Sequence, residues 1–294
     1  MTLRLSTAQT GLVLMVAGSA VDSTSGLFTR LAGADGFTTA SARGFFAFAV
    51  MFGYLVWREG RNTPRRLLGI GGAGAAFVLI NALGMISNMI SLANTAVANF
   101  YMIFATAPFA AAVAARLVLR ERTDMATLLA AMAGFAGIAV MMASGTRSGG
   151  LSGDLVAVGS VASFAMLALV VRRNPGIDLP PVIALGVLAS ALLSLPFAAF
   201  GSLQPGQWGL LAAFGLFQLA LGNVLVFAAM SRIPPAQSGL LGILNAAFAP
   251  LWVFAALGEV PSPATLTGGG IILAAAVLHL VWTLTRRAAS AAAG

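Results

Sequence analysis

The chain contains Ala105-Thr106-Ala107-Pro108-Phe109 leading into Arg120-Glu121-Arg122, and later Asn245-Ala246-Ala247-Phe248 leading into Gly258-Glu259. Pro108 precedes Glu121 by 13 residues, and Ala246 precedes Glu259 by the same 13. The two copies lie about 140 residues apart in a chain of 294. We therefore predict two copies of one structural unit, residues 1–146 and residues 147–294.

The composition indicates a membrane protein. Charged residues make up 8% of the chain and hydrophobic residues 59%, with a mean hydropathy of +0.96, whereas a soluble domain has about 25% charged residues. We predict an all-α membrane protein with ten transmembrane helices. They are expected near residues 9–30, 37–57, 67–88, 95–118, 125–144, 153–171, 181–200, 208–230, 236–257 and 266–284. Five spans per half is an odd number, so the second repeat is inverted in the membrane, an arrangement typical of alternating-access transporters.

The formal charge of +8 is explained by topology and does not indicate nucleic-acid binding. With the N-terminus inside, thirteen of the sixteen arginines fall on the cytoplasmic side or at its span ends, and the other side keeps Arg30, Arg43 and Arg147. This asymmetry follows the positive-inside rule. It predicts a multi-pass protein of the cytoplasmic (inner) membrane with both termini in the cytoplasm.

Two five-span halves, each with an Ala-rich fourth span leading into Arg-Glu or Gly-Glu, resemble the drug/metabolite transporter superfamily with its EamA-type repeat. Within it, Ala249-Pro250-Leu251-Trp252-Val253 followed by Gly258-Glu259-Val260-Pro261 is most similar to the YddG-type exporters of aromatic and other neutral amino acids. The resemblance implies a bacterial exporter of amino acids. The copies differ in one respect: Ala246 replaces Pro108, and the second proline, Pro250, lies one turn later. We expect both prolines to act as hinges, because each removes a backbone donor from its helix.

Asp22 lies well inside the first predicted span, where a charge costs about 2.5–3.5 kcal/mol. Arg43 in the second span is its nearest plausible partner, and a structural ion pair is the favoured interpretation. The alternative makes Asp22 a proton carrier or an amine-binding group. Glu121 and Glu259 fall at span ends on opposite sides, where we expect pairing with Arg120, Arg122 or lipid headgroups.

Neutral polar and aromatic residues follow helical spacing on equivalent spans of the two halves. Each could simply join neighbouring helices, at about 0.6 kcal/mol per contact. As a set they favour a cavity lining, with amides for a zwitterion and aromatic rings for an apolar side chain. On the eighth span the candidates are Gln218 and Asn223. The predicted substrate-binding residues are Asn81, Tyr101, Ser163, Phe164, Asn223, Asn245, Phe248 and Trp252.

The resulting hypothesis is a secondary transporter that exports small neutral or zwitterionic solutes by alternating access. An efflux carrier for drugs or organic cations is the alternative. Such a carrier would need unpaired acidic side chains in its cavity, and only Asp22 is available. An intramembrane enzyme is a more distant alternative, because the chain has no Cys and one His, His279, and so lacks a paired nucleophile and base. We expect no cofactor, no metal and no nucleic-acid partner. Besides the solute, the expected partner is the lipid bilayer, and the expected state is a monomer.

Overall fold

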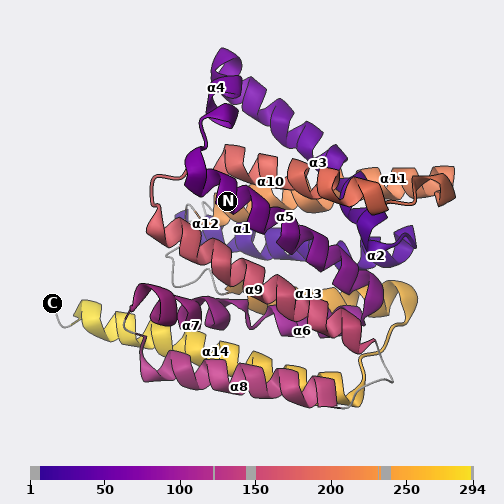
Figure 1. Cartoon of the computed structure of the whole chain (residues 1–294). Helices are drawn as coiled ribbons and strands as arrows, with labels where there is room; N and C mark the ends of the chain where they lie inside the picture. Colours follow the sequence, from indigo (N-terminus) through magenta and orange to yellow (C-terminus); the bar gives the residue numbers. More distant parts are fainter. Residues whose placement is uncertain (1–6, 122, 144–149, 231, 233–239, 293–294) are drawn as a thin grey trace, which may run out of the picture.

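All regular elements in the described part of the chain are helices, and no strand is present there (Figure 1). The structure is a computed structural model and describes residues 7–121, 123–143, 150–230, 232 and 240–292. Nine helical segments within these ranges are long and apolar enough to cross a membrane, and Gly242–Leu257 is a shorter apolar helix. The predicted all-α membrane fold is therefore confirmed. The start of the expected ninth span at residue 236 and the predicted boundary between residues 146 and 147 lie outside the described residues.

The first half forms its five spans from eight helices, because the chain breaks within two spans and turns before a third. The helices are α1 (Thr7–Asp22), α2 (Ser25–Ala32), α3 (Gly36–Glu59), α4 (Thr63–Leu68), α5 (Gly71–Asn94), α6 (Val97–Phe104), α7 (Ala107–Leu119) and α8 (Met125–Ala143). The expected third span began at residue 67 but starts at Gly71. The left-handed backbone of Gly71, with φ of 62°, separates α4 from α5 at a position where a side chain would strain the backbone.

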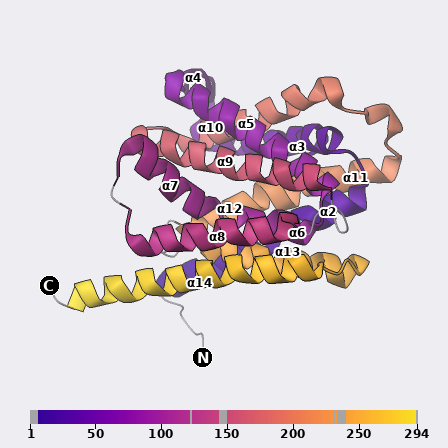
Figure 2. The same ribbon diagram turned by 60° about the horizontal axis from the view of Figure 1, so that its bottom comes forward.

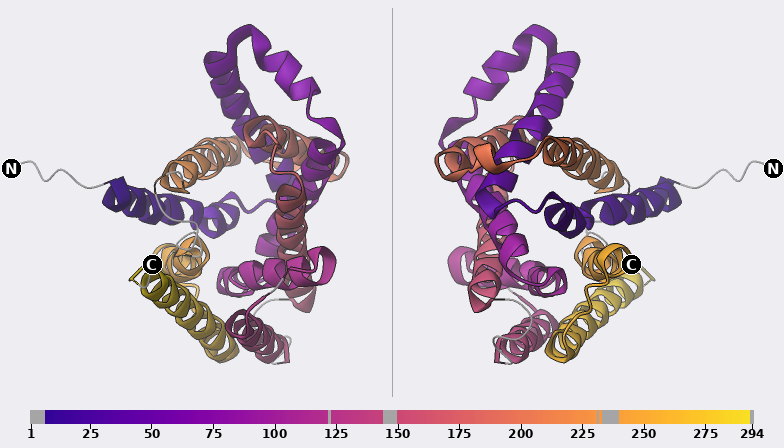
Figure 3. Two further views of the ribbon diagram at one scale, coloured as in Figure 1. Left: turned by 90° about the vertical axis from the view of Figure 1, so that its left-hand side faces the viewer. Right: turned by 90° about the vertical axis from the view of Figure 1, so that its right-hand side faces the viewer.

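The second half follows the same order of spans. Its elements are α9 (Leu151–Arg173), α10 (Leu179–Ser194), α11 (Pro205–Ala213), the π-helical segment η4 (Phe214–Leu221), α12 (Gly222–Met230), α13 (Leu240–Leu257) and α14 (Pro263–Ala292). The two halves pack into one bundle: α5 contacts α9 and α10, while α1 contacts α12 and α13. Figure 2 shows α8 and α14 side by side along one edge. In Figure 3, α3 and α4 project from the opposite edge.

Three spans are irregular at their centres. The first span breaks at Ser23–Thr24 between α1 and α2, the fourth breaks at Ala105–Thr106 between α6 and α7, and the eighth contains η4. Pro108 lies in the first turn of α7, next to the break. Pro250 lies inside α13, which continues through it. The helix is therefore not interrupted at Pro250, and the irregular segment of the second half, η4, lies in the preceding span.

Candidate functional site

Asp22 is the last residue of α1, and its carboxylate is held by two amides from the second half. Gln218 Nε2 in η4 donates to Asp22 Oδ1 at 2.8 Å, and Asn245 Nδ2 in α13 donates to Asp22 Oδ2 at 2.7 Å. The break after α1 also frees the backbone carbonyl of Asp22, which accepts from Tyr101 Oη and Gln218 Nε2, each at 3.2 Å. Four elements, α1, α6, η4 and α13, therefore meet at Asp22, a residue that is itself only half-buried.

Arg43 approaches this site from α3, and Gln218 lies between it and Asp22. Arg43 Nη1 donates to Gln218 Oε1 at 3.1 Å, and the guanidinium carbon lies 4.7 Å from the centroid of the Phe214 ring. The direct Asp22–Arg43 ion pair expected from the sequence does not form within 4.0 Å. The two opposite charges are instead joined through one amide, which donates to the anion and accepts from the cation.

Two buried polar atoms close to Asp22, an amide oxygen and a hydroxyl, have no hydrogen-bond partner in the described part of the chain. They are Asn245 Oδ1, on the same amide that donates to Asp22, and Ser19 Oγ, one turn before Asp22 in α1. Arg43, Gln218, Asn245 and Tyr101 are each no more than 5% exposed. A buried polar atom without a partner costs free energy, so these acceptors suit a ligand that brings N–H donors.

Trp252 stands at the edge of this site. Its ring nitrogen Nε1 donates to Ser23 Oγ at 3.0 Å, and the residue is 38% exposed. Phe248 lies one helical turn away on α13, between Asn245 and Trp252 in the sequence, and is half-buried. The Trp252 ring therefore lies next to the residue that follows Asp22.

Four predicted lining residues make their contacts elsewhere. A side-chain carbon added at Gly186 would meet Asn81 within 3.1 Å, which shows that Asn81 packs against α10. Asn223 Nδ2 donates to the carbonyl of Leu219 in its own helix. On α9, Ser163 Oγ donates to the carbonyl of Gly159, and Phe164 packs edge-to-face on Phe104 with ring centroids 5.9 Å apart. These contacts join or cap helices and do not reach Asp22.

The sequence missed the roles of Ser23 and Phe214, and it left Gln218 among the weaker candidates. Nothing in the sequence around Ser23 indicated a role for it, because its place at a helix break depends on tertiary contacts. Gln218 could have been ranked higher, because a long amide in the middle of an apolar span must find a polar partner. In the described residues no group of three or more His, Asp or Glu side chains gathers as a metal site.

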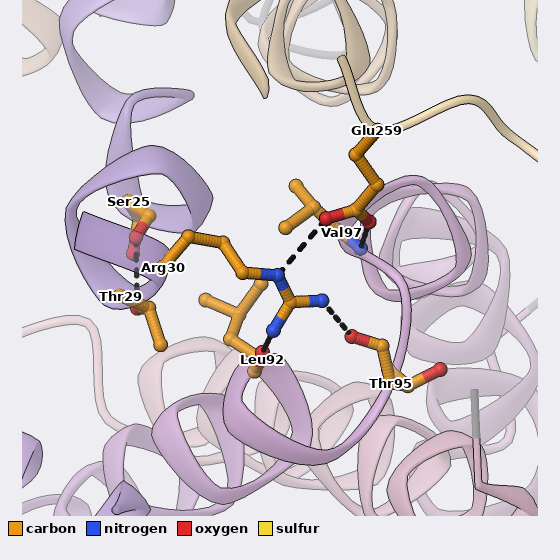
Figure 4. Close-up of polar contacts among 7 residues, drawn as sticks. All are labelled: Ser25, Thr29, Arg30, Leu92, Thr95, Val97 and Glu259. Atoms are coloured by element: carbon orange, nitrogen blue, oxygen red, sulfur yellow. Dashed lines mark hydrogen bonds and ion pairs between the residues drawn. The ribbon is translucent and has the colours of Figure 1, made fainter. Parts of the chain in front are cut away.

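The glutamates of the repeated motif have different partners from those predicted. Glu121 pairs with Arg172 at 2.5 Å, and Glu259 pairs with Arg30 at 2.9 Å (Figure 4). Arg120, one of the expected neighbours, forms neither of these pairs, and the other, Arg122, lies outside the described residues. The true partners are remote in sequence, so a search of adjacent residues could not find them.

Comparison with known proteins agrees with this architecture. A model of the EamA-like transporter family matches residues 9–143 and again residues 151–281. The threonine/homoserine exporter RhtA of Escherichia coli (strain K12) is 30% identical over 134 residues, covering 43% of this chain and 44% of RhtA; RhtA of the O157:H7 strain matches equally. The chain thus spans less than half the length of these relatives. One solved crystal structure aligns with a TM-score of 0.61 at 20% identity, over 92% of this chain and 98% of its own, which shows a shared fold.

Proposed function

Since the chain belongs to the EamA-like transporter family, we propose that it exports small zwitterionic solutes, foremost neutral amino acids, by alternating access. The name of the matched relative, a threonine/homoserine exporter, supports amino acids as the solute class. We also propose that the end rich in arginine, where α3, α7 and α9 finish, faces the cytoplasm. Export then proceeds from this end toward the end that holds Arg30 and Glu259.

The observation that supports the proposal best is the pair of opposite charges joined through Gln218. An α-amino acid carries an ammonium and a carboxylate group on one carbon. The half-buried carboxylate of Asp22 and the unpartnered Oδ1 of Asn245 are acceptors for the ammonium group. Arg43 uses only Nη1 for a hydrogen bond to a described residue, and its remaining N–H groups are donors suited to a carboxylate.

An organic cation would need only half of this arrangement. It would bind the acceptors at Asp22 and would be repelled by Arg43. A zwitterion instead uses both charges and leaves the site without a net change in charge, which lowers the cost of carrying it through a membrane. The aromatic rings of Trp252 and Phe248 suit an apolar side chain next to the two charged groups.

The test is counterflow in proteoliposomes with labelled neutral amino acids. Asp22→Asn and Arg43→Gln should each weaken apparent affinity by roughly tenfold to a hundredfold, the worth of a hydrogen bond to a charged group in a buried site. Asn223→Ala is the matched control, because that amide bonds only within its own helix. Competition by N-acetylated amino acids, which lack the ammonium group, should be absent. Transport of an organic cation that is lost in Asp22→Asn but kept in Arg43→Gln would favour the cation carrier instead.

A further inference from the structure

Two ion pairs at opposite ends of the molecule are related by the internal repeat. Arg30 ends the first span and pairs with Glu259, at the end of the ninth; Arg172 ends the sixth span and pairs with Glu121, at the end of the fourth. Arg172 follows Arg30 by 142 residues and Glu259 follows Glu121 by 138, both close to the repeat interval. Each pair therefore joins one half to the other through equivalent positions.

The Arg30–Glu259 pair is embedded in backbone contacts at its end of the molecule (Figure 4). Arg30 also donates to the carbonyls of Leu92, at 2.9 Å, and Thr95, at 2.6 Å, where α5 ends. Glu259 Oε1 accepts from the N–H of Val97, at 3.0 Å, where α6 begins. The cation thus caps a carboxyl end and the anion caps an amino end, each in the orientation that the helix dipole favours.

The second half contacts the same α5–α6 turn from another side. Asp154 of α9 accepts from Thr95 Oγ1 at 2.5 Å and from Asn99 Nδ2 at 3.3 Å, while Thr265 Oγ1 of α14 donates to Asn99 Oδ1 at 2.5 Å. Asp154, Asn99 and Thr265 are no more than 4% exposed. Two acids of the second half, Asp154 and Glu259, therefore fix this turn of the first half and tie the two halves together at this end of the bundle.

The Arg172–Glu121 pair, at the arginine-rich end, is more exposed to solvent. Its side chains are 47% and 46% exposed, against 26% and 27% for Arg30 and Glu259. The neighbouring Arg173 adds one long contact, from Nη2 to the carbonyl of Val118 at 3.4 Å. Water competes more strongly for an exposed pair, so this pair contributes less to holding its end closed.

We propose that the two pairs are alternating latches, one for each end of the transport pathway. Both pairs are formed in this structure, and Arg30–Glu259 is the more buried of the two. The proposal rests on alternating access as the mode of transport. Opening the Arg30 end requires breaking the bonds of Arg30 and Glu259 to the α5–α6 turn. The equivalent Arg172–Glu121 latch stays formed in that state and breaks only when the opposite end opens. The glutamates of the repeated motif thereby acquire a role in gating.

The test uses single cysteines in this chain, which has none of its own. Ser25→Cys, a near-isosteric change on α2 between Asp22 and Arg30, is the reporter; Ser25 is 5% exposed. An impermeant maleimide is applied from the side that labels Ser202→Cys, an exposed residue at the same end. Glu259→Gln, which keeps an acceptor for Val97, should raise the labelling rate of the reporter roughly fivefold or more. Arg30→Gln removes the other partner of the same latch and should raise the labelling rate of the reporter by a similar factor.

Glu121→Gln is the matched control at the repeat-equivalent position, and it should leave that labelling rate unchanged or lower it, by at most about twofold. An equal rise in Glu121→Gln and Glu259→Gln, or no rise in either variant of the Arg30 latch, overturns the proposal. Labelling requires no solute, so the latch can be supported even if amino-acid counterflow fails, and the two proposals fail independently.

Discussion

Replacing Gln218 by Met tests whether the amide between Asp22 and Arg43 organises the site. Met has nearly the volume and flexibility of Gln, so Gln218→Met removes hydrogen bonds without leaving a cavity. Three bonds are lost: those from Nε2 to the carboxylate and carbonyl of Asp22, and that from Arg43 to Oε1.

The expected loss of stability follows from these bonds. Two of them involve a charged group, worth about 1.5–3 kcal/mol each, and the third is worth about 1 kcal/mol. The buried Met side chain returns about 1.5–3 kcal/mol. The net destabilisation is therefore on the order of 3 kcal/mol. At about 2–4 °C per kcal/mol for a large domain, the Tm should fall by roughly 6–12 °C.

The measurement is thermal unfolding in detergent, followed by tryptophan fluorescence. Asn223→Leu is the control. It removes an amide from the next helix, and that amide bonds only within its own helix, so this variant should lower the Tm by much less than Gln218→Met. A Tm of Gln218→Met equal to that of the wild type would refute the reasoning. It would show that Asp22 and Arg43 relax into a direct pair without help from the amide.

Two further predictions concern other parts of the chain. Asp124 caps α8 by accepting from the N–H of Thr127 at 2.7 Å and from its hydroxyl at 2.9 Å. Burial raises the pKa of Asp124, but these hydrogen bonds lower it by more, so that the pKa lies below its ordinary value. Asp124→Ala should thus cost about 1 kcal/mol of stability at neutral pH, measured as a lower Tm. The difference in Tm between the variant and the wild type should vanish as the pH falls through the lowered pKa of Asp124, because a carboxyl group with a lowered pKa stabilises the fold only while it is ionised. Arg61→Cys should be labelled from the cytoplasmic side and Ser202→Cys from the other; labelling of both from one side would contradict the inverted repeat.

The spans and the main charged residues could be predicted from the sequence because membranes impose strict rules. Long apolar segments can be recognised from their hydropathy alone, and a single acid deep in an apolar span stands out from its neighbours. Helical spacing also placed Asn245 and Trp252 on one face of the ninth span. In the structure Asn245 donates to Asp22, the last residue of α1, and Trp252 donates to Ser23, the next residue. These features depend on local sequence, so local reasoning finds them.

Partner choice across the bundle could not be predicted in the same way. Amides such as Asn81 and Gln218 look alike in sequence, yet one packs against Gly186 and the other lies between two charges. The same limit applies to helix breaks. Pro250 leaves α13 intact, while the break at Ser23–Thr24 has no proline, because tertiary contacts re-satisfy or remove backbone bonds irrespective of local propensity.

The break after α1 explains why the site and the latch lie on one short segment. Ending α1 at Asp22 frees the carbonyl that Tyr101 and Gln218 occupy, so the irregular backbone is satisfied by the residues that define the site. The helix α2 then runs from Ser25 past Arg30, and eight residues of helical rise span about 12 Å. Under the proposed function, solute binding at Asp22 and release of Arg30 act on opposite ends of the same two-turn helix. Because coupling between sites is reciprocal, loosening the Arg30–Glu259 latch must then also change the affinity for solute at Asp22.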